Sequence, residues 1–193
     1  EKIVEAVDAS EEEKTLQEIN SGIMAIRKSD LIRWLPKLKP ANAQGELYLT
    51  DLIEIALDES AKVRAVVCDD ADEVMGINTQ WDLCNAERIL QRRRVQELAL
   101  EGVKIADPNR LDIRGEVQVG KDCFIDVNVV LNGSVVLGDG VSIGPGSIVS
   151  DSKLSAGVKV LPHSVIDGAE IRANSSIGPF ARVRTGTVIG EGA

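Results

Sequence analysis

The sequence is poor in aromatic residues, histidine and cysteine, and it has no long apolar run. Aromatic residues fill 3% of its 193 positions, and there is one histidine. The cysteines Cys68, Cys84 and Cys123 show no CxxC spacing, which argues against a zinc site and indicates reduced thiols. No apolar segment approaches the length of a membrane span, and the N-terminus lacks the layout of a signal peptide. These absences predict a cytoplasmic protein without a membrane partner.

The charge balance is acidic, with 31 Asp and Glu against 22 Lys and Arg and a net charge of −9. A basic face for nucleic acid or an anionic membrane would need strong local compensation in such a chain. We therefore expect small molecules or other protein chains as partners, and no nucleic acid.

An aliphatic anchor recurs at almost every sixth position over Ile113–Ile189, with five-residue steps only at Val149–Leu154 and Ile166–Ile171. A small or β-branched residue follows most anchors by four positions. This period fits neither a helix nor a flat sheet, and it predicts a parallel β-helix of hexapeptides whose anchors and small residues both point inward. The anchors are Ile113, Val119, Ile125, Leu131, Leu137, Ile143, Val149, Leu154, Val160, Ile166, Ile171, Ile177, Val183 and Ile189.

The residue directly after an anchor is often Gly, Asp or Asn, residue types that tolerate the backbone angles of a tight corner. We interpret these positions as the corners of the coil. They are Gly120, Asp126, Asn132, Gly138, Gly144, Gly178 and Gly190.

Residues 1–80 alternate strand-like and helix-like patterns, which favours an α/β layer with a mostly parallel sheet. Residues 81–101 contain no Gly or Pro and predict one long helix that acts as a rigid spacer. Its Arg92, Arg93 and Arg94 fit a solvated helix face better than a phosphate site. Strands are expected at 3–4, 19–26 and 63–67, and helices at 30–38 and 49–58.

Four strings and the order of these parts resemble one family, the bacterial bifunctional N-acetylglucosamine-1-phosphate uridyltransferase and glucosamine-1-phosphate acetyltransferase. The resemblance runs through all 193 residues. The strings are Ile3-Val4-Glu5, Gln17-Glu18-Ile19-Asn20-Ser21-Gly22, Gly45-Glu46-Leu47-Tyr48-Leu49-Thr50-Asp51 and Ile177-Gly178-Pro179-Phe180-Ala181-Arg182-Val183-Arg184.

The resemblance implies a fold in three parts. Residues 1–80 would be the last part of a Rossmann-like α/β nucleotidyltransferase domain, 81–101 a linker helix, and 102–193 the first coils of a left-handed β-helix that forms homotrimers. The family acetylates glucosamine-1-phosphate with acetyl-CoA. It then joins the product to UTP with the help of Mg²⁺, giving UDP-N-acetylglucosamine for peptidoglycan and lipopolysaccharide synthesis.

By the same resemblance, Glu5 and Asn20 bind the sugar nucleotide, and Asn78 binds both the sugar nucleotide and Mg²⁺. A carboxylate and an amide suit a sugar because together they accept and donate hydrogen bonds. An amide oxygen is a hard neutral ligand of the kind that Mg²⁺ accepts. An aspartate expected upstream of residue 1 would complete the metal site.

Glu46, Tyr48 and Thr50 alternate along their string, so they share one face if it is extended. The resemblance places this string beside the sugar pocket, which favours sugar contact for Glu46 and Tyr48. Thr50-Asp51 is equally consistent with a helix N-cap pair.

Arg184 matches the arginine that holds the phosphate of glucosamine-1-phosphate, and a guanidinium fork suits phosphate geometry. The family's proline after this arginine is Thr185 here. The lone histidine, His163, could act as a base, but the family's catalytic histidine falls beyond residue 193, so we expect His163 to be a surface turn residue.

The chain begins with Glu rather than Met and ends within a hexapeptide, so we expect an internal fragment. Residues 1–80 contain no Gly-rich phosphate loop, and the acetyl-CoA coils are missing, which predicts a fragment inactive in both reactions. Two alternatives stay open. One is another sugar-1-phosphate nucleotidyltransferase (adenylyl, guanylyl or thymidylyl), and the other is a non-catalytic trimerisation module.

Overall fold

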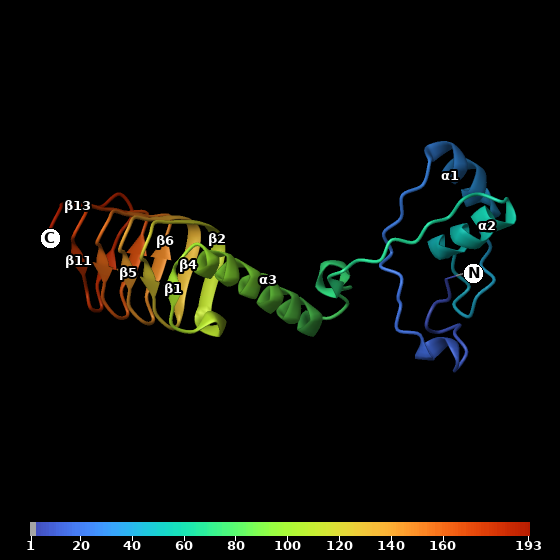
Figure 1. The fold of residues 1–193 in the computed structure, drawn as a ribbon, viewed down its shortest axis with the longest axis horizontal. Helices are drawn as coiled ribbons and strands as arrows, with labels where there is room; N and C mark the ends of the chain where they lie inside the picture. Colours follow the sequence, from blue (N-terminus) through green and yellow to red (C-terminus); the bar gives the residue numbers. More distant parts are fainter. Residues whose placement is uncertain (1–2) are drawn as a thin grey trace. The chain divides into compact units, whose positions relative to one another are not determined.

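A computed structural model describes residues 3–193. The chain divides into two compact units, Glu1–Gly76 and Ile77–Ala193. Figure 1 shows the first unit with its short helices and the second with a long helix and a coil of short strands. Each unit is described by itself.

The first unit has a small core around two helices, α1 (Lys28–Trp34) and α2 (Leu52–Asp58). Trp34, Leu52 and Ala56 are its buried residues. The indole Nε1 of Trp34 donates to Glu59 Oε2 at 2.9 Å, so the polar edge of the buried ring is satisfied. Four short 3-10 turns complete the unit, namely η1 (Glu13–Thr15), η2 (Leu35–Lys37), η3 (Leu49–Asp51) and η4 (Ala71–Val74).

The two predicted helices of this unit are confirmed, whereas its predicted strands at 3–4, 19–26 and 63–67 are wrong. Within residues 3–193, no strand precedes Lys104. Apolar side chains of these segments face solvent instead, with Ile19 80% and Val66 85% exposed. A strand is stable only when a neighbour pairs its N–H and C=O groups, and the described residues of this unit provide no such neighbour.

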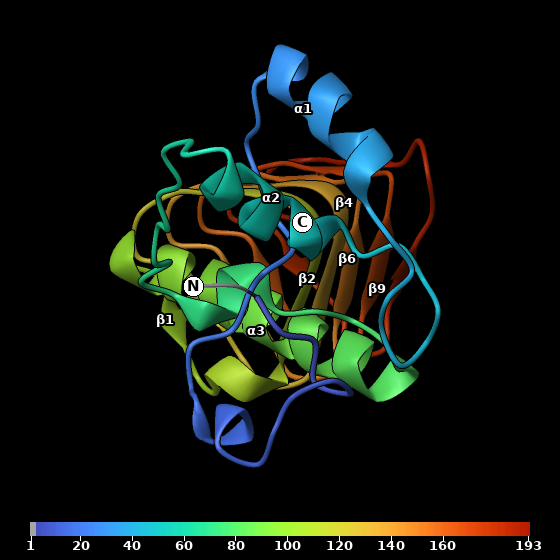
Figure 2. The ribbon, with the colours of Figure 1, turned by 90° about the vertical axis from the view of Figure 1, so that its right-hand side faces the viewer.

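The second unit is a parallel β-helix, as the hexapeptide period predicts, and it is left-handed, as the family resemblance implies. Figure 2 shows β2, β4, β6 and β9 side by side in one wall of the coil. One sheet has five strands, in the order β1 (Lys104–Ile105), β3 (Phe124–Ile125), β5 (Ser142–Ile143), β8 (Lys159–Val160) and β11 (Ser176–Ile177). The other has eight, which are β2 (Leu111–Val119), β4 (Val129–Leu137), β6 (Ile148–Ser150), β7 (Lys153–Leu154), β9 (Val165–Asp167), β10 (Glu170–Ile171), β12 (Arg182–Val183) and β13 (Val188–Ile189).

The long strand β4 turns a corner and so divides the larger sheet into two faces. Its first half pairs with β6 (Val130 opposite Ile148) and its second half with β7 (Val136 opposite Lys153). With the five-stranded sheet this gives three faces, and three hexapeptides complete one coil. Each anchor therefore stacks on the anchor one coil away.

The interior of the coil follows the sequence pattern closely. Twelve of the fourteen anchors are buried, and Val119 and Ile189 are partly buried. The second inward position holds small residues such as Ser147, whose hydroxyl donates to Leu161 O at 3.2 Å and accepts from Ser164 N at 3.3 Å. A buried serine is thus tolerated because its hydrogen bonds stay inside the coil.

The interpretation of the corners was wrong in one respect. Gly178, directly after the anchor Ile177, has φ 104° as the interpretation expects, but at most corners the positive φ falls two or three residues after the anchor, as at Asn128 and His163, each with φ 58°. Gly138 serves close packing instead: a Cβ there would lie 2.6 Å from the backbone N of Ala156 in the next coil. Neighbouring coils therefore come too close there for a side chain.

The long helix α3 (Gln80–Leu100) starts with a capping box formed by Thr79 and Asp82. It belongs to the second unit, and its later half packs on the β-helix, where Val95 and Leu98 join the core. The 3-10 turn η5 (Pro108–Arg110) lies against the same helix.

The side chain of Gln91 covers the open edge of strand β2. Its Nε2 donates to Ile113 O at 2.8 Å, and its Oε1 accepts from Ile113 N at 2.7 Å. Arg94 Nη1 also donates to Ile113 O at 2.7 Å. A primary amide presents the same donor and acceptor as a peptide group, so Gln91 takes the place of a neighbouring strand at this residue.

Replacement of Gln91 by alanine is expected to lower the stability of the second unit by about 1–3 kcal/mol, because the buried Ile113 N–H loses its partner. Urea unfolding measures the stability, and amide hydrogen exchange at Ile113 should become faster. Gln96→Ala is the matched control, since Gln96 is exposed on the same helix. Equal stability of the two variants would contradict the role given to Gln91.

Candidate functional site

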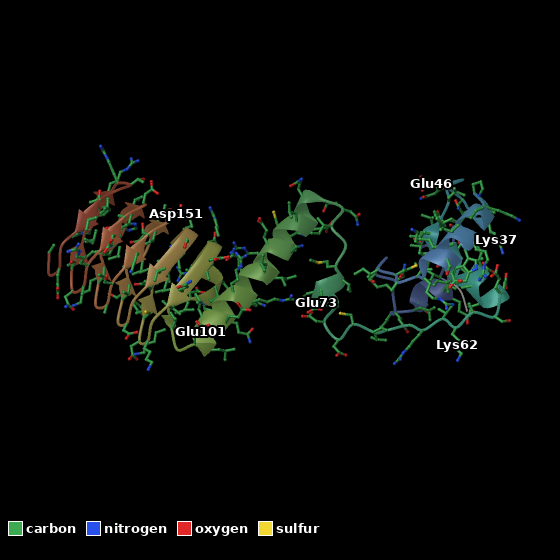
Figure 3. The ribbon with its side chains drawn as sticks, turned by 90° about the horizontal axis from the view of Figure 1, so that it is seen from above. Lys37, Glu46, Lys62, Glu73, Glu101 and Asp151 are labelled. Carbon is green, nitrogen blue, oxygen red and sulfur yellow. The ribbon has the colours of Figure 1, made fainter. Side chains whose placement is uncertain are left out.

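A cluster of polar side chains in the first unit brings together four of the predicted sugar-site residues. The hydroxyl of Thr50 donates to Glu5 Oε1 at 3.2 Å. Tyr48 is half-buried, and the charges of Glu5 and Glu46 both act on its phenol. Glu46 itself is exposed, and Figure 3 shows it on the first unit.

Thr50 lies inside η3 and is buried, and neither Thr50 nor Asp51 makes a side-chain cap to a helix. Asp51 does occupy the N-cap position of α2, but the capping hydrogen bond that the N-cap alternative implies is not formed. The hydroxyl of Thr50 turns to Glu5 instead, which joins residues 45 positions apart in the sequence.

Asp8 completes this cluster, and sequence reasoning missed it. Its Oδ1 accepts from Ala43 N at 2.9 Å, and its negative charge acts on Tyr48 and raises the pKa of the phenol. Asn42 stabilises the loop that precedes Tyr48, since its Oδ1 accepts from the backbone N of both Gln44 and Glu46 at 3.1 Å. An Asp three residues before the exposed Glu11 carries no local signal of this contact.

The environment of Tyr48 raises the pKa of its phenol. Burial is the largest cause, followed by the negative charges of Asp8, Glu46 and Glu5. The phenol therefore stays protonated and can donate a hydrogen bond. Carboxylates that accept, beside hydroxyls that donate, form the kind of lining that suits a polyhydroxylated ligand.

The single tyrosine allows a direct test of this environment. We expect the tyrosinate absorbance of the chain to appear with a midpoint above the ordinary value of about 10, and Asp8→Asn to lower that midpoint. A group whose pKa is raised by folding contributes stability below its unfolded pKa, and that contribution is lost as the pH rises through the folded pKa. Glu116→Gln, in the other unit, is the control. A midpoint at about 10 that Asp8→Asn leaves unchanged would contradict the assignment.

Two other predicted residues lie outside this cluster. Asn20 is exposed and, within residues 3–193, makes no hydrogen bond to Glu5, Tyr48 or Thr50. Asn78 belongs to the second unit, where it precedes α3 and its backbone N donates to Asp82 Oδ2 at 3.1 Å.

The described residues do not form a Mg²⁺ site by themselves. Across residues 3–193, no three His, Cys, Asp or Glu side chains gather in a way that could hold a metal ion. Asn78 is exposed and offers one amide oxygen, whereas Mg²⁺ requires near-octahedral coordination by several oxygens.

The predicted phosphate arginine of the second unit, Arg184, follows the anchor Val183 and is exposed at a corner. Next to it, the hydroxyl of Thr185 donates to Asp167 Oδ2 at 3.2 Å in the preceding coil. His163 is exposed at a different corner, as expected, and stacks on Phe180 with ring centroids 5.3 Å apart.

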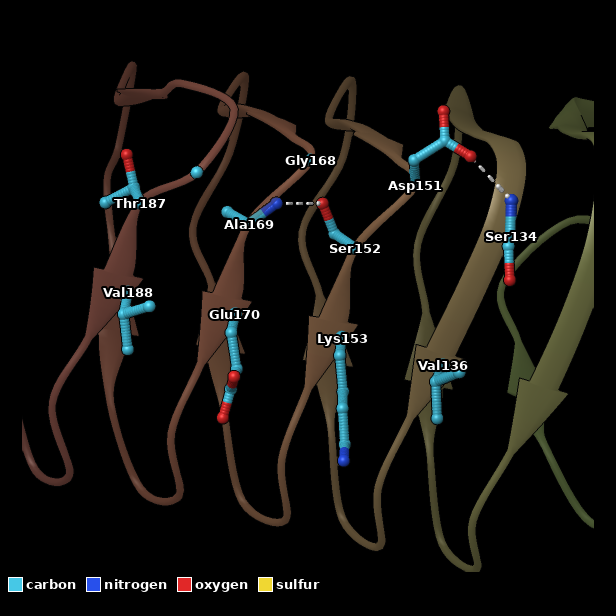
Figure 4. A pocket seen from close by; sticks show the side chains of 11 residues that line it. Ser134, Val136, Asp151, Ser152, Lys153, Gly168, Ala169, Glu170, Thr187 and Val188 are labelled. Carbon is cyan, nitrogen blue, oxygen red and sulfur yellow. Dashed lines mark hydrogen bonds between the residues drawn. The ribbon is translucent and has the colours of Figure 1, made fainter.

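A groove of about 430 Å³ runs along the corner that carries Arg184, and it begins at Gly186. Figure 4 shows Lys153 and Glu170 among its lining residues, in successive coils between Val136 and Val188. At its rim, Asp151 Oδ1 accepts from Ser134 N at 2.9 Å.

Sequence reasoning did not identify this groove, although a signal was present. Both five-residue steps, Val149–Leu154 and Ile166–Ile171, lie at this corner in successive coils. A corner that is one residue shorter than its neighbours recedes, and two such corners in register leave a hollow. The groove follows from the irregularity of the repeat.

The fold and these sites define a hexapeptide-repeat β-helix protein joined to a unit with a carboxylate and hydroxyl cluster. A family model described as the GMPPB C-terminal domain matches residues 113–193, which is the β-helix. Curated relatives cover almost the whole chain. Proteins named "Bifunctional protein GlmU" are 45% identical over 185 residues in Marinobacter nauticus, 46% over 184 in Acinetobacter baumannii and 46% over 192 in Methylococcus capsulatus.

The chain belongs to the family of these bifunctional GlmU proteins. The three matches cover 95–99% of the chain and 40–42% of the relatives, so the chain spans about two fifths of their length. Between residues 3 and 193, none of the helices has the length and apolar character needed to cross a membrane.

Proposed function

We propose that this chain is part of a bifunctional transferase that makes UDP-N-acetylglucosamine. The first activity would acetylate glucosamine-1-phosphate with acetyl-CoA. The second would transfer the uridylyl group of UTP to N-acetylglucosamine-1-phosphate and release pyrophosphate. Residues 1–80 would contribute to the uridyltransferase, 81–101 would link the two parts, and 102–193 would begin the acetyltransferase.

One observation carries this proposal: the GlmU relatives match both units of the chain in one continuous alignment of about 45% identity. The β-helix alone would not distinguish between classes, because hexapeptide repeats occur in several kinds of protein. The cluster of Glu5, Tyr48 and Thr50 adds support, since these three residues, proposed for the sugar site from the resemblance, lie together in the fold.

In the uridyltransferase, Glu5 would accept hydrogen bonds from sugar hydroxyls, and Thr50 holds the carboxylate in place from its other side. Tyr48 would donate from its protonated phenol, with Glu46 at the exposed side of the cluster. Asn20 and Asn78 would complete the contacts to UDP-N-acetylglucosamine. Mg²⁺ would neutralise phosphate charge, and Asn78 would supply one of its ligands.

In the acetyltransferase, Arg184 would bind the phosphate of glucosamine-1-phosphate through its guanidinium fork. Its exposure at a corner leaves it accessible to a ligand. The β-helix would assemble into a homotrimer, as in the family that the sequence resembles. The chain by itself would show no turnover in either reaction.

A chimera tests this proposal with two separate readouts. The matching segment of the Marinobacter nauticus relative is replaced by this chain, and each reaction is assayed alone. We expect both activities, because the chain aligns with that relative over 185 residues. Glu5→Gln should lower uridylyl transfer by about tenfold or more and leave acetyl transfer unchanged, whereas Arg184→Gln should do the reverse.

Each variant is thus the control for the other. A chimera that folds but transfers no uridylyl group would contradict the nucleotidyltransferase assignment. If that chimera still forms trimers, the trimerisation-module alternative would replace it. A chimera that uses GTP, ATP or dTTP in preference to UTP would support another sugar-1-phosphate nucleotidyltransferase, an alternative with which the family match over residues 113–193 also agrees.

A further inference from the structure

A second concave surface lies between α3 and η5, within the second unit, and no residue of the sites described above lines it. Its volume is about 340 Å³, which falls within the usual range for small-ligand pockets. Ile89 and Pro108 supply its apolar surface. The polar side chains that matter for a ligand are Asn85, Arg88, Arg92 and Asn109.

The helix presents these groups on one face, because Asn85, Arg88 and Arg92 follow one another by three and four residues. Of the acidic residues of the same helix, Asp82 lies one turn before Asn85 and is engaged in the capping box with Thr79, and the glutamates lie elsewhere on the circumference. At about 100° per residue, Glu87 and Glu97 are each about 140° away from Arg92. No Asp or Glu is among the residues that line this concavity.

Two carboxylates on the neighbouring segments, Asp112 and Asp107, are already engaged by arginines, one of which is Arg88 of this surface. Asp112 accepts from Arg88 at 2.7 Å and from Arg114 at 2.9 Å, so one negative charge is shared by two positive ones. Asp107 pairs with Arg110 at 2.8 Å. These three arginines and two aspartates, Arg92 excluded, leave a net charge of +1.

Arg92 adds another positive charge. Its guanidinium is exposed, and within residues 3–193 it takes part in no hydrogen bond or ion pair. In a chain of net charge −9, this concavity is therefore locally positive and offers donors only, apart from the amide oxygens of its asparagines.

We propose that this concavity, the α3–η5 pocket, binds the phosphoryl group of a small phosphorylated compound. Arg92 and Arg88 supply guanidinium donors, the amide groups of Asn85 and Asn109 donate from the two sides, and Ile89 with Pro108 covers an apolar part of the ligand. A phosphoryl group has enough acceptor oxygens to use several of these donors at once, whereas a carboxylate has two. This inference does not rest on the proposed function, since it uses only residues outside both proposed sites.

Isothermal titration of inorganic phosphate and of pyrophosphate into the chain at low ionic strength tests the pocket. We expect saturable binding, with Arg92→Gln raising the dissociation constant by about tenfold or more. Arg172→Gln is the matched control, because Arg172 is an exposed arginine on the β-helix outside this pocket. Side-chain amide resonances of Asn85 and Asn109 should shift on titration.

Several results would overturn the inference. One is that neither anion gives a saturable isotherm, and another is that Arg92→Gln and Arg172→Gln weaken binding equally, which indicates non-specific attraction. Acetate bound as tightly as phosphate would also overturn it, because the pocket would then be a general anion or acidic-peptide site. Arg92 is exposed, so its replacement leaves the fold intact, and circular dichroism verifies this. Asn85→Ala gives a second, uncharged probe.

Discussion

Replacement of Gly115 by alanine is expected to destabilise the β-helix by about 2–6 kcal/mol, the sum of backbone strain and overpacking. Gly115 lies at a corner of β2 with φ 155°, an angle that alanine rarely adopts. An added Cβ would stand 2.1 Å from the carbonyl O of Gly133 and 2.7 Å from its N. Both contacts are to backbone, so no side-chain rotation can relieve them.

The position explains why the effect should be large. Gly115 pairs with Gly133 in the middle of the nine-residue ladder between β2 and β4. A shift that relieves the clash would disturb the pairs on both sides, because the two strands are hydrogen-bonded along their whole length. The first coil would then lose its register with the second.

Gly140→Ala is the control for this experiment. Its φ of 69° also lies in the left-handed region, but a Cβ there meets nothing within 4 Å. Its cost should be only the strain of a left-handed alanine, about 1–2 kcal/mol. Urea unfolding followed by circular dichroism measures both. Equal destabilisation by the two variants would show that close approach of the coils contributes nothing.

The β-helix could be predicted from the sequence because its information is local and repeated. Each anchor has the same environment, so fourteen positions support one interpretation, and an error at one of them does not change it. The corner conformation could not be read with the same precision. Glycine occurs both where φ is positive and where neighbouring coils touch. The sequence alone does not show which of the two reasons accounts for a given glycine.

The first unit was harder to predict because its contacts are not repeated. Ile19 and Val66 are β-branched residues of the type that is common in strands. A strand, however, also depends on a partner strand that its own sequence does not specify. The hydrogen bond from Thr50 to Glu5 could not be predicted from local sequence patterns either, because it joins residues far apart in the chain. The resemblance to a family identified both residues, whereas Asp8, outside the matched strings, was found only from the structure.

Replacement of Ile143 by alanine is expected to cost about 2–5 kcal/mol, the usual range for truncation of a fully buried aliphatic side chain. Ile143 is 0% exposed and lies in β5, paired with Ile125 on one side and Val160 on the other. Interior atoms of neighbouring coils cannot close the cavity, because their spacing is fixed by the backbone ladders above and below.

Ile148→Ala is the matched control. It removes the same side-chain atoms as Ile143→Ala, but from a residue of β6 that is 36% exposed. Its cost should be below that of Ile143→Ala because water already reaches part of it. In a stacked repeat each coil is stabilised by its neighbours, so the Ile143 cavity should also speed amide exchange in β3 and β8. If exchange rose only within β5, the coils would be independent folding units, and the stability of the β-helix would not come from their stacking.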